Sequence, residues 1–375
     1  MSSVQMQPQP PSQAMPLRYE PSFEQSEEDE AGTTAELLDS LRKINSITFK
    51  DTGHGLRSVH AKSHGLLGGE LRVLEGLPAE LAQGLFASPG RYPLVLRFST
   101  VPGDLLDDSV STPRGLAIKI FGVPGERLPG SEGAATQDFV LVNGPAFGAP
   151  DARHFLKNLK LVAATTDKGE SLKKAFSALA RGAEKVVESF GGKSPTLLAL
   201  GGHPETHVLG ETYYSQAPLL HGPYMVKVSV APVAPSLTAL TGAEVDLRDK
   251  PNGLREAVID YFATQAGEWE VRVQFCTDLT AMPVEDASAV WSEDLSPFVP
   301  VARIVVPPQP AWNDARAAAI DDGLSFSPWH GIAAHRPIGS IMRVRREIYN
   351  TMAEIRARQN GRLIEEPSSL DALSL

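Results

Sequence analysis

Short apolar segments, separated by glycine and proline turns, fall into two groups along the chain. One group lies between residues 65 and 144 and the other between residues 224 and 309, and each segment alternates or runs apolar. Such segments are typical of β-strands. The pattern therefore predicts strands at 65–76, 92–100, 114–122, 138–144, 224–233, 268–278 and 299–309.

Segments with a helical period of apolar residues lie before, between and after these strands. They predict helices at 33–47, 78–88, 151–164, 171–190, 194–202, 253–267 and 343–358. The first has threonine at positions 33 and 34 as a candidate N-cap. Strands in two groups, with helices inserted and appended, predict an α+β domain around an antiparallel sheet or barrel, and a ligand pocket between barrel and helices.

The two ends of the chain differ from this domain in composition. Residues 1–32 are rich in Pro, Gln, Ser and Glu, which predicts a disordered arm or a segment that orders only on another subunit. We expect a folded domain at 33–360 and a tail at 361–375. The N-terminus lacks the basic and apolar regions of a secretory signal, and no apolar run is long enough to cross a membrane. A cytoplasmic location is expected.

Composition excludes several classes of function. The chain of 375 residues has a net charge of 35 − 45 = −10, which argues against nucleic-acid binding. Its single cysteine, Cys276, lies in an apolar run and predicts a buried thiol rather than a disulfide or a cysteine-rich metal site. No glycine-rich nucleotide motif and no G-x-S-x-G motif occur, so nucleotide-dependent and serine-hydrolase chemistry are disfavoured.

Several polar residues near the predicted strands are candidates for chemistry, although each also has an ordinary structural role. His60 precedes a strand and by itself is typical of a structural histidine. Arg97 lies inside an apolar strand and needs a partner, either an anionic ligand or a local carboxylate. Asn143 ends a strand, where its amide serves a turn or a site. His203 and His207 have zinc-pair spacing, but Pro204 stands where a metalloprotease has glutamate.

The last predicted helix contains a tyrosine with arginines on its own face. Arg345 is four residues before Tyr349 and Arg356 is seven residues after it, which places all three along one side of a helix. A solvated basic face is one reading of this pattern. The other is a haem site, because tyrosine is a known haem ligand and arginines bind carboxylates such as haem propionates. Arg343, Arg346 and Arg358 are expected on a solvated face.

The order of five segments resembles that of the haem catalase family. They are "RSVHAK", "RFSTVPG", "TPRGLAIKIF", "DFVLVNGPAF" and R-x-x-x-Y-x₆-R, and together they run from about residue 56 to residue 358. The resemblance implies a catalase-like fold, an antiparallel β-barrel with inserted and appended helices that enclose haem b. It also implies a peroxide-cleaving oxidoreductase and a homo-oligomer, with a dimer favoured.

The resemblance also assigns roles residue by residue. On the distal side, His60 matches the acid–base histidine, Ser99 the serine that hydrogen-bonds it, and Asn143 the distal asparagine. Tyr349 matches the proximal iron ligand, and Arg345 the arginine that holds it as a phenolate. The remaining matches are to the propionate-binding arginines: Arg57, Arg97 and Arg356.

Some positions depart from the family pattern. Thr112 stands where the substrate channel usually has aspartate, "REIYNTM" replaces the usual proximal surround, and the chain ends soon after this helix. These features resemble the small bacterial catalase-related peroxidases. Two alternatives are a fatty-acid hydroperoxide isomerase or lyase and a non-catalytic haem carrier. Val59 before the histidine argues against the isomerase branch, where threonine is typical, and the His60–Asn143 pair argues against a carrier.

Overall fold

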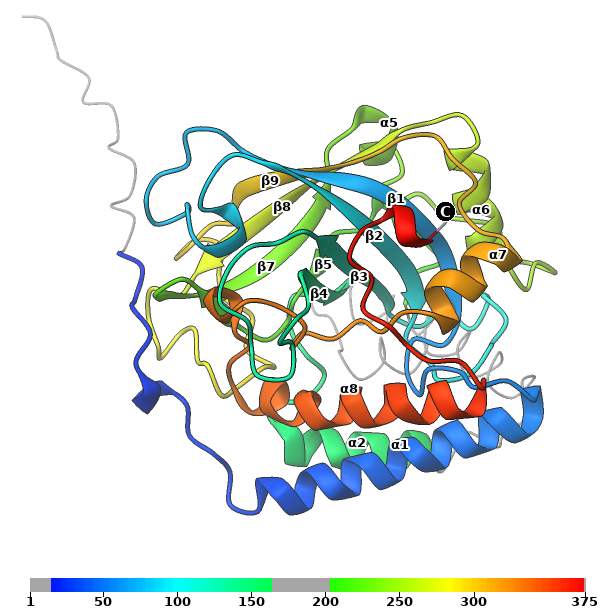
Figure 1. Cartoon of the computed structure of the whole chain (residues 1–375), viewed down its shortest axis with the longest axis horizontal. Helices are drawn as coiled ribbons and strands as arrows, with labels where there is room; N and C mark the ends of the chain where they lie inside the picture. The colour runs from blue at the N-terminus through cyan, green and yellow to red at the C-terminus, as the bar shows by residue number, and fades with distance from the viewer. Residues whose placement is uncertain (1–14, 164–202, 374–375) are drawn as a thin grey trace, which may run out of the picture.

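The computed structural model describes residues 15–163 and 203–373, which form a β-barrel with a layer of helices beneath it (Figure 1). Eight strands close the barrel in the order β5-β4-β3-β2-β1-β9-β8-β7, because β5 pairs with both β4 and β7, and β6 adds to β7. All pairs are antiparallel. The strands are β1 (Ser63–Val73), β2 (Arg91–Thr100), β3 (Arg114–Phe121), β4 (Thr136–Val142), β5 (Tyr213–Tyr214), β6 (Leu219–His221), β7 (Tyr224–Pro232), β8 (Gly267–Phe275) and β9 (Val299–Val306).

The barrel interior is filled by alternate residues of each strand. In β2, Leu96 and Phe98 join the main core, whereas Arg97 and Ser99 face the outside of the wall. The next strand continues this outer face, since Arg97 lies opposite Ala117 and Ser99 opposite Gly115. The seven predicted strands are confirmed. The two short strands, β5 and β6, were missed because two or three residues are too few to show an alternation of apolar and polar positions.

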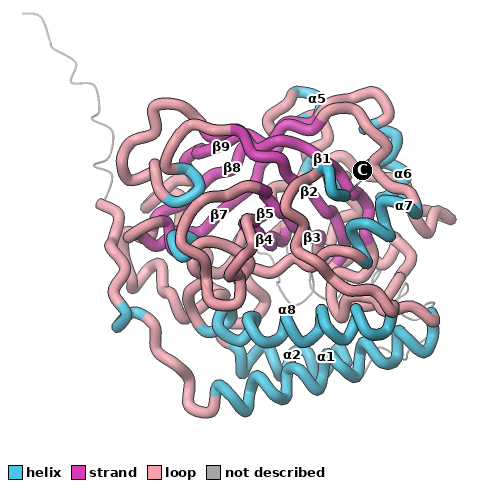
Figure 2. Tube along the Cα trace, viewed as in Figure 1, coloured by secondary structure: helices cyan, strands magenta, loops and turns pink. Residues whose placement is uncertain are grey.

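Three long helices lie side by side below the barrel (Figure 2). They are α1 (Glu30–Thr52), α2 (Ala152–Ala163) and α8 (Ser340–Gln359). Their apolar faces form a second core that includes Leu41 and Ile348, with Tyr349 packed against it. The shorter helices are α5 (Pro235–Thr238), α6 (Gly253–Phe262) and α7 (Asp314–Arg316), which continues into a π-helical turn, η5 (Ala317–Asp322). Single 3₁₀ turns are η1 (Pro21–Phe23), η2 (Gly84–Phe86), η4 (Val208–Gly210), η6 (Ala333–His335) and η7 (Asp371–Leu373).

Two helix predictions differ from the structure. Residues 78–88 form turns and the short η2 rather than an α-helix, because Gly84 takes a left-handed φ of 55° that ends any regular helix. Helix α1 begins earlier than expected, since the carboxylate of Asp29 accepts a hydrogen bond from the backbone of Gly32 and caps it. The helices predicted at 171–190 and 194–202 lie outside the described residues.

We expected residues 1–32 to form a disordered arm or a segment that orders only on another subunit. Residues 15–29 instead run along the protein itself to α1 (Figure 1). Arg18 pairs with Tyr224, and Glu24 accepts a hydrogen bond from the backbone of Gly339 at 3.0 Å. Two acidic residues near the N-terminus, Glu24 and Glu30, share a cationic partner that lies far away in the chain. That partner is Arg343, which contacts the carboxylates of Glu24, Glu30 and Glu285 at 3.3, 2.9 and 2.7 Å.

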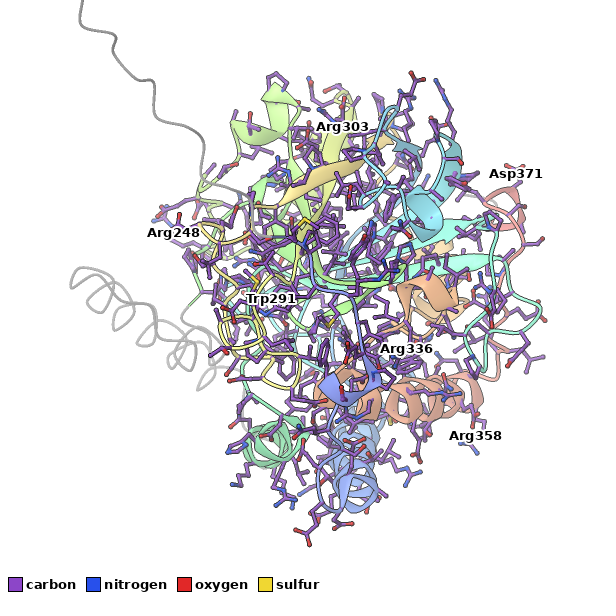
Figure 3. The ribbon with its side chains drawn as sticks, turned by 90° about the vertical axis from the view of Figure 1, so that its left-hand side faces the viewer. Arg248, Trp291, Arg303, Arg336, Arg358 and Asp371 are labelled. Carbon is purple, nitrogen blue, oxygen red and sulfur yellow. The ribbon has the colours of Figure 1, made fainter. Side chains whose placement is uncertain are left out.

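The expected solvated face of α8 is therefore smaller than predicted. Arg343 is largely buried in the acidic cluster, whereas Arg358 is exposed on the outside of the helix (Figure 3). Arg346 is also exposed, and one of its nitrogens donates to the carbonyl of Pro129. Cys276 is buried and free, as predicted, and burial raises its pKa to about 11. No helix in the described parts of the chain has both the length and the apolarity needed to span a bilayer.

Candidate active site

A cavity that is partly open to solvent lies between the outer wall of the barrel and α8. Apolar side chains line most of it, and its polar lining comes from segments far apart in the chain. The polar and charged lining residues are Arg57, Ser58, His60, Arg97, Ser99, Ser325, Tyr349 and Arg356. Seven of the eight residues carried over from the family therefore lie at or beside one cavity, since Arg345 bonds Tyr349.

His60 is held in a defined orientation at the cavity wall. Its Nδ1 lies 3.1 Å from Oγ of Ser99, and its backbone has a left-handed φ of 57°. The ring lies against Gly115, where a Cβ would come within 2.4 Å of Nδ1 and Cε1. Gly115 is therefore a site residue that we did not single out, although it belongs to the "TPRG" segment.

Electrostatics keep the imidazole of His60 neutral. Burial, followed by repulsion from Arg97 and Arg345, lowers its pKa from 6.5 to about 3. A neutral imidazole has one nitrogen that accepts a proton. If Nδ1 donates to Ser99, Nε2 is that acceptor.

Tyr349 and Arg345 form a pair on successive turns of α8. Nη2 of Arg345 donates to the phenol oxygen at 2.5 Å, and the guanidinium carbon lies 4.9 Å from the centre of the tyrosine ring. The i, i+4 spacing of the two residues brings them together, as the sequence indicated. The phenol oxygen of Tyr349, a residue of the cavity wall, thus accepts a hydrogen bond from a cationic group.

The other three arginines converge on one turn, η5. Arg97 donates from Nε to Oδ1 of Asp321 at 2.6 Å, and Arg57 donates to the backbone oxygen of the same residue at 2.8 Å. Arg356 donates to the backbone oxygens of Asp321, Asp322 and Leu324. Arg97 therefore has a carboxylate of the protein as a partner, although it lies 224 residues away in the chain.

Charge is not balanced at this arginine cluster. Burial lowers the pKa of Arg356 to about 10 and that of Arg57 as well, and repulsion from Arg97 adds to both shifts. Burial also opposes the charged form of Asp321, but Arg97 and Arg57 outweigh it and its pKa lies below the ordinary value. Asp322 also attracts Arg57 and Arg356. Three guanidinium groups therefore face two carboxylates, and the cluster keeps an excess of positive charge.

Asn143 is placed differently from the other candidates. It is not among the described residues that line the cavity, and its side chain is bonded to a separate set of groups. Its Oδ1 accepts from the backbone of Arg114 at 2.8 Å, and its Nδ2 contacts Glu211 and, at 3.0 Å, Nε2 of His203. The side-chain hydrogen bonds of Asn143 therefore lead to a half-buried polar cluster and not to His60. Glu211 was not singled out, because nothing in its local sequence marks it.

His203 and His207 do not form a metal pair. His203 contacts Arg114 and Asn143, whereas Nδ1 of His207 accepts from the backbone of Leu209 at 3.2 Å and caps a 3₁₀ turn. Among the described residues, no group of three or more His, Cys, Asp and Glu side chains is arranged to hold a metal ion.

Comparisons with known proteins identify the fold. No family model and no curated protein sequence matches the chain. Solved structures do match: a fungal catalase (19% identity, TM-score 0.56, 85% of this chain and 62% of that one) and catalase A from Saccharomyces cerevisiae (18%, 0.55, 84% and 63%). A bacterial catalase matches with 18% identity, a TM-score of 0.56 and coverage of 95% and 68%.

The chain thus spans roughly two thirds of the length of these catalases. At such identities the likeness establishes the fold, and the expected catalase-like α+β fold is confirmed.

Proposed function

We propose that the protein is a haem-dependent oxidoreductase that cleaves the O–O bond of a peroxide. One observation carries the proposal: a neutral His60, held by Ser99, lines the same cavity as Tyr349, whose oxygen is bonded by Arg345. This combination supports the proposal, because a proton acceptor and a side chain of a type that can ligate haem iron line one cavity. The catalase fold supports the proposal by analogy.

The residues around the cavity fit haem b. Apolar side chains such as Leu41, Val59 and Met352 suit a flat apolar ring, and Tyr349 belongs to the side chains that hold haem iron in proteins. Propionates are anions that match the excess positive charge of the arginine cluster. Iron would be held by the ring and by the phenol oxygen of Tyr349.

The chain itself would supply proton transfer and orientation. Bound haem would supply the iron centre and its redox chemistry. His60 would take the peroxide proton on Nε2 and return it to the departing oxygen, giving water from hydrogen peroxide or an alcohol from an organic hydroperoxide. The other oxygen atom would become water with two electrons from an organic donor or from a second peroxide, through the redox chemistry that haem would supply. Ser99 would fix the ring, and the nearby guanidinium groups keep it in the neutral form that accepts a proton. Asn143 bonds elsewhere, so the proposal assigns this step to His60 alone.

We further propose a peroxidase of the small catalase-related type that uses organic hydroperoxides. Thr112, at the position of the family's channel aspartate, is buried, and its hydroxyl has no partner among the described residues. A neutral side chain here removes a charge that would favour small polar peroxides. We also propose a homodimer, which light scattering of the purified protein tests. A cytoplasmic location is retained as a separate proposal.

A visible spectrum of the purified, haem-reconstituted protein is the first experiment. We expect a tyrosine-ligated haem spectrum that is lost in Tyr349→Phe and unchanged in Tyr261→Phe, a tyrosine on α6. Full haem occupancy and an unchanged spectrum in Tyr349→Phe would overturn the ligand assignment.

Turnover then separates the functions. Donor oxidation with an alkyl hydroperoxide, lost in His60→Ala, supports the peroxidase, and oxygen evolution from hydrogen peroxide measures catalase activity. With a fatty-acid hydroperoxide, an epoxide or ketol product instead of an alcohol identifies an isomerase. A loaded protein that turns over none of these substrates is a haem carrier.

A further inference from the structure

Asp321 is a carboxylate at the meeting point of several segments of the site. It lies in the π-helical turn η5, after α7, and 19% of its side chain is exposed. One oxygen accepts from Nε of Arg97 at 2.6 Å and from Nη1 of Arg57 at 3.3 Å. The other accepts from Oγ of Ser63 at 2.6 Å, so one side chain joins the segment before β1, the first residue of β1, and β2.

Arg97 transmits this connection to His60. While Nε binds Asp321, Nη2 donates to the backbone oxygen of His60 at 2.8 Å and to that of Ala61 at 3.2 Å. The guanidinium is 2% exposed, so these protein groups take the place of water around it. The carboxylate of Asp321 therefore fixes the plane of the Arg97 guanidinium. That guanidinium in turn holds two successive backbone carbonyl groups, those of His60 and Ala61.

His60 needs such support because its φ of 57° is unusual for a residue with a side chain. A backbone in this region persists only where the surroundings determine it. The bond from the His60 amide to the carbonyl of Val101, at 2.7 Å, holds one side of the residue, and Arg97 holds the other. The direction of the imidazole into the cavity follows from this backbone conformation.

The same turn also contacts the helix that carries Tyr349. Arg356, seven residues after the tyrosine on α8, donates to the backbone oxygen of Asp321. This contact uses the main chain, so a change of the Asp321 side chain leaves its acceptor in place. In the described part of the chain, the side-chain hydrogen bonds of Asp321 reach only Arg57, Ser63 and Arg97, and its charge also attracts Arg356.

We propose that Asp321 is a positioning residue that, through Arg97, holds His60 in the orientation needed for proton transfer. The proposal deepens the proposed function, because it names what keeps the acid–base group in place. Asp321 touches no reacting atom in this scheme. The substitution Asp321→Asn keeps the size of the side chain but removes the charge that binds Arg97 and Arg57.

The matched control is Asp322→Asn, which removes the same charge one residue later in the same turn. The carboxylate of Asp322 contacts His54 at 2.9 Å and not Arg97. Both variants are prepared as full chains with ¹⁵N-labelled histidine, and the His60 resonance is identified by its absence in His60→Ala.

The first measurement uses the protein without haem. We expect Asp321→Asn to shift the His60 ring resonances and Asp322→Asn to leave them unchanged. Unchanged His60 resonances in Asp321→Asn overturn the proposal, whatever the protein's function is. If Asp321→Asn does not fold, Ser63→Ala is used, because it removes one of the hydrogen bonds to the Asp321 carboxylate. A shift of the His60 resonances in that variant supports the proposal, and unchanged resonances overturn it.

The second measurement uses the haem-loaded protein and the rate of hydroperoxide cleavage. We expect a loss of at least about tenfold in Asp321→Asn with the haem spectrum retained, because small misplacement of a catalytic group is costly. The double variant with His60→Ala should be no slower than His60→Ala alone. Additive losses overturn action through His60. Absence of cleavage in the wild type refutes the proposed function instead, and leaves the resonance test standing.

Discussion

The imidazole of His60 lies against the backbone of Gly115, so closely that a Cβ at Gly115 would be 2.4 Å from two of its ring atoms. Gly115 faces Ser99 across the β2–β3 ladder, and Ser99 is the residue that bonds Nδ1 of the ring. One cross-strand pair therefore provides both the space and the hydrogen bond for this histidine.

Gly115→Ala should displace the His60 ring and weaken the fold. Overpacking of this kind typically costs about 1–3 kcal/mol. We expect the free energy of unfolding to fall by that amount in denaturant titrations, and hydroperoxide cleavage to fall while the haem spectrum is kept. Gly148→Ala is the control, since a Cβ there meets no atom within 4 Å. Equal stability and activity in both variants would contradict the close approach.

Arg345→Gln should weaken haem binding without removing the tyrosine ligand. Hydrogen bonds to charged groups contribute about 1.5–3 kcal/mol, so affinity should fall by roughly tenfold or more. Haem titration followed by absorbance measures the change. Arg358→Gln, an exposed arginine of the same helix, should bind haem as the wild type does. Identical affinities for the two variants would remove Arg345 from the site.

Buried histidines should make the fold less stable in mild acid. Burial lowers the pKa to about 3 in His60 and His335 and to about 4 in His207 and His221, from an ordinary 6.5. The unfolded chain then binds more protons than the folded one between pH 6.5 and about 4. Stability is therefore full above pH 6.5 and falls as the pH decreases through this window.

Denaturant titrations at pH 7.5, 6.5, 5.5 and 4.5 test this expectation, and calorimetry in buffers of different ionisation enthalpy counts the protons taken up on unfolding. A free energy of unfolding that stays constant between pH 7 and pH 5 would refute it.

His330 should have the opposite effect on the alkaline side. Although burial opposes its charge, contacts with Asp138 at 3.3 Å and Glu366 at 3.1 Å raise its pKa to about 9. Its stabilising contribution is full below pH 6.5 and is lost as the pH rises towards 9. Lys119 holds the same two carboxylates at 2.8 Å, which ties the C-terminal tail to the barrel at Glu366. The tail then continues to η7, where Asp371 is labelled in Figure 3.

In His330→Gln, the fall in stability between pH 6.5 and pH 9 should become smaller than in the wild type. His154→Gln, which removes an exposed histidine, should keep the wild-type slope. Chemical denaturation across this range measures both slopes, and parallel curves for all three proteins would count against the ion pairs of His330.

The strands of the barrel and the pairing of Arg345 with Tyr349 could be predicted from the sequence, because both depend on local periods. Alternation with period two placed Arg97 on the face opposite to Phe98, which lies in the core. A spacing of four residues on a helix brought Arg345 to the phenol oxygen. The likeness of the motifs to those of catalases pointed to five further residues that line the cavity but not to Gly115; the five are His60, Ser99, Arg57, Arg97 and Arg356.

The tertiary structure alone decided which groups meet across long distances in the chain. Asp321 lies 224 residues after Arg97, and Arg343 lies 313 residues after Glu30. Nothing in the local sequence of either carboxylate marks its partner. Asn143 likewise ends a strand as predicted, yet its amide bonds to Glu211, 68 residues later in the chain. Local period specifies the face on which a side chain lies. The group that it contacts depends on how the closed barrel and α8 bring distant segments together.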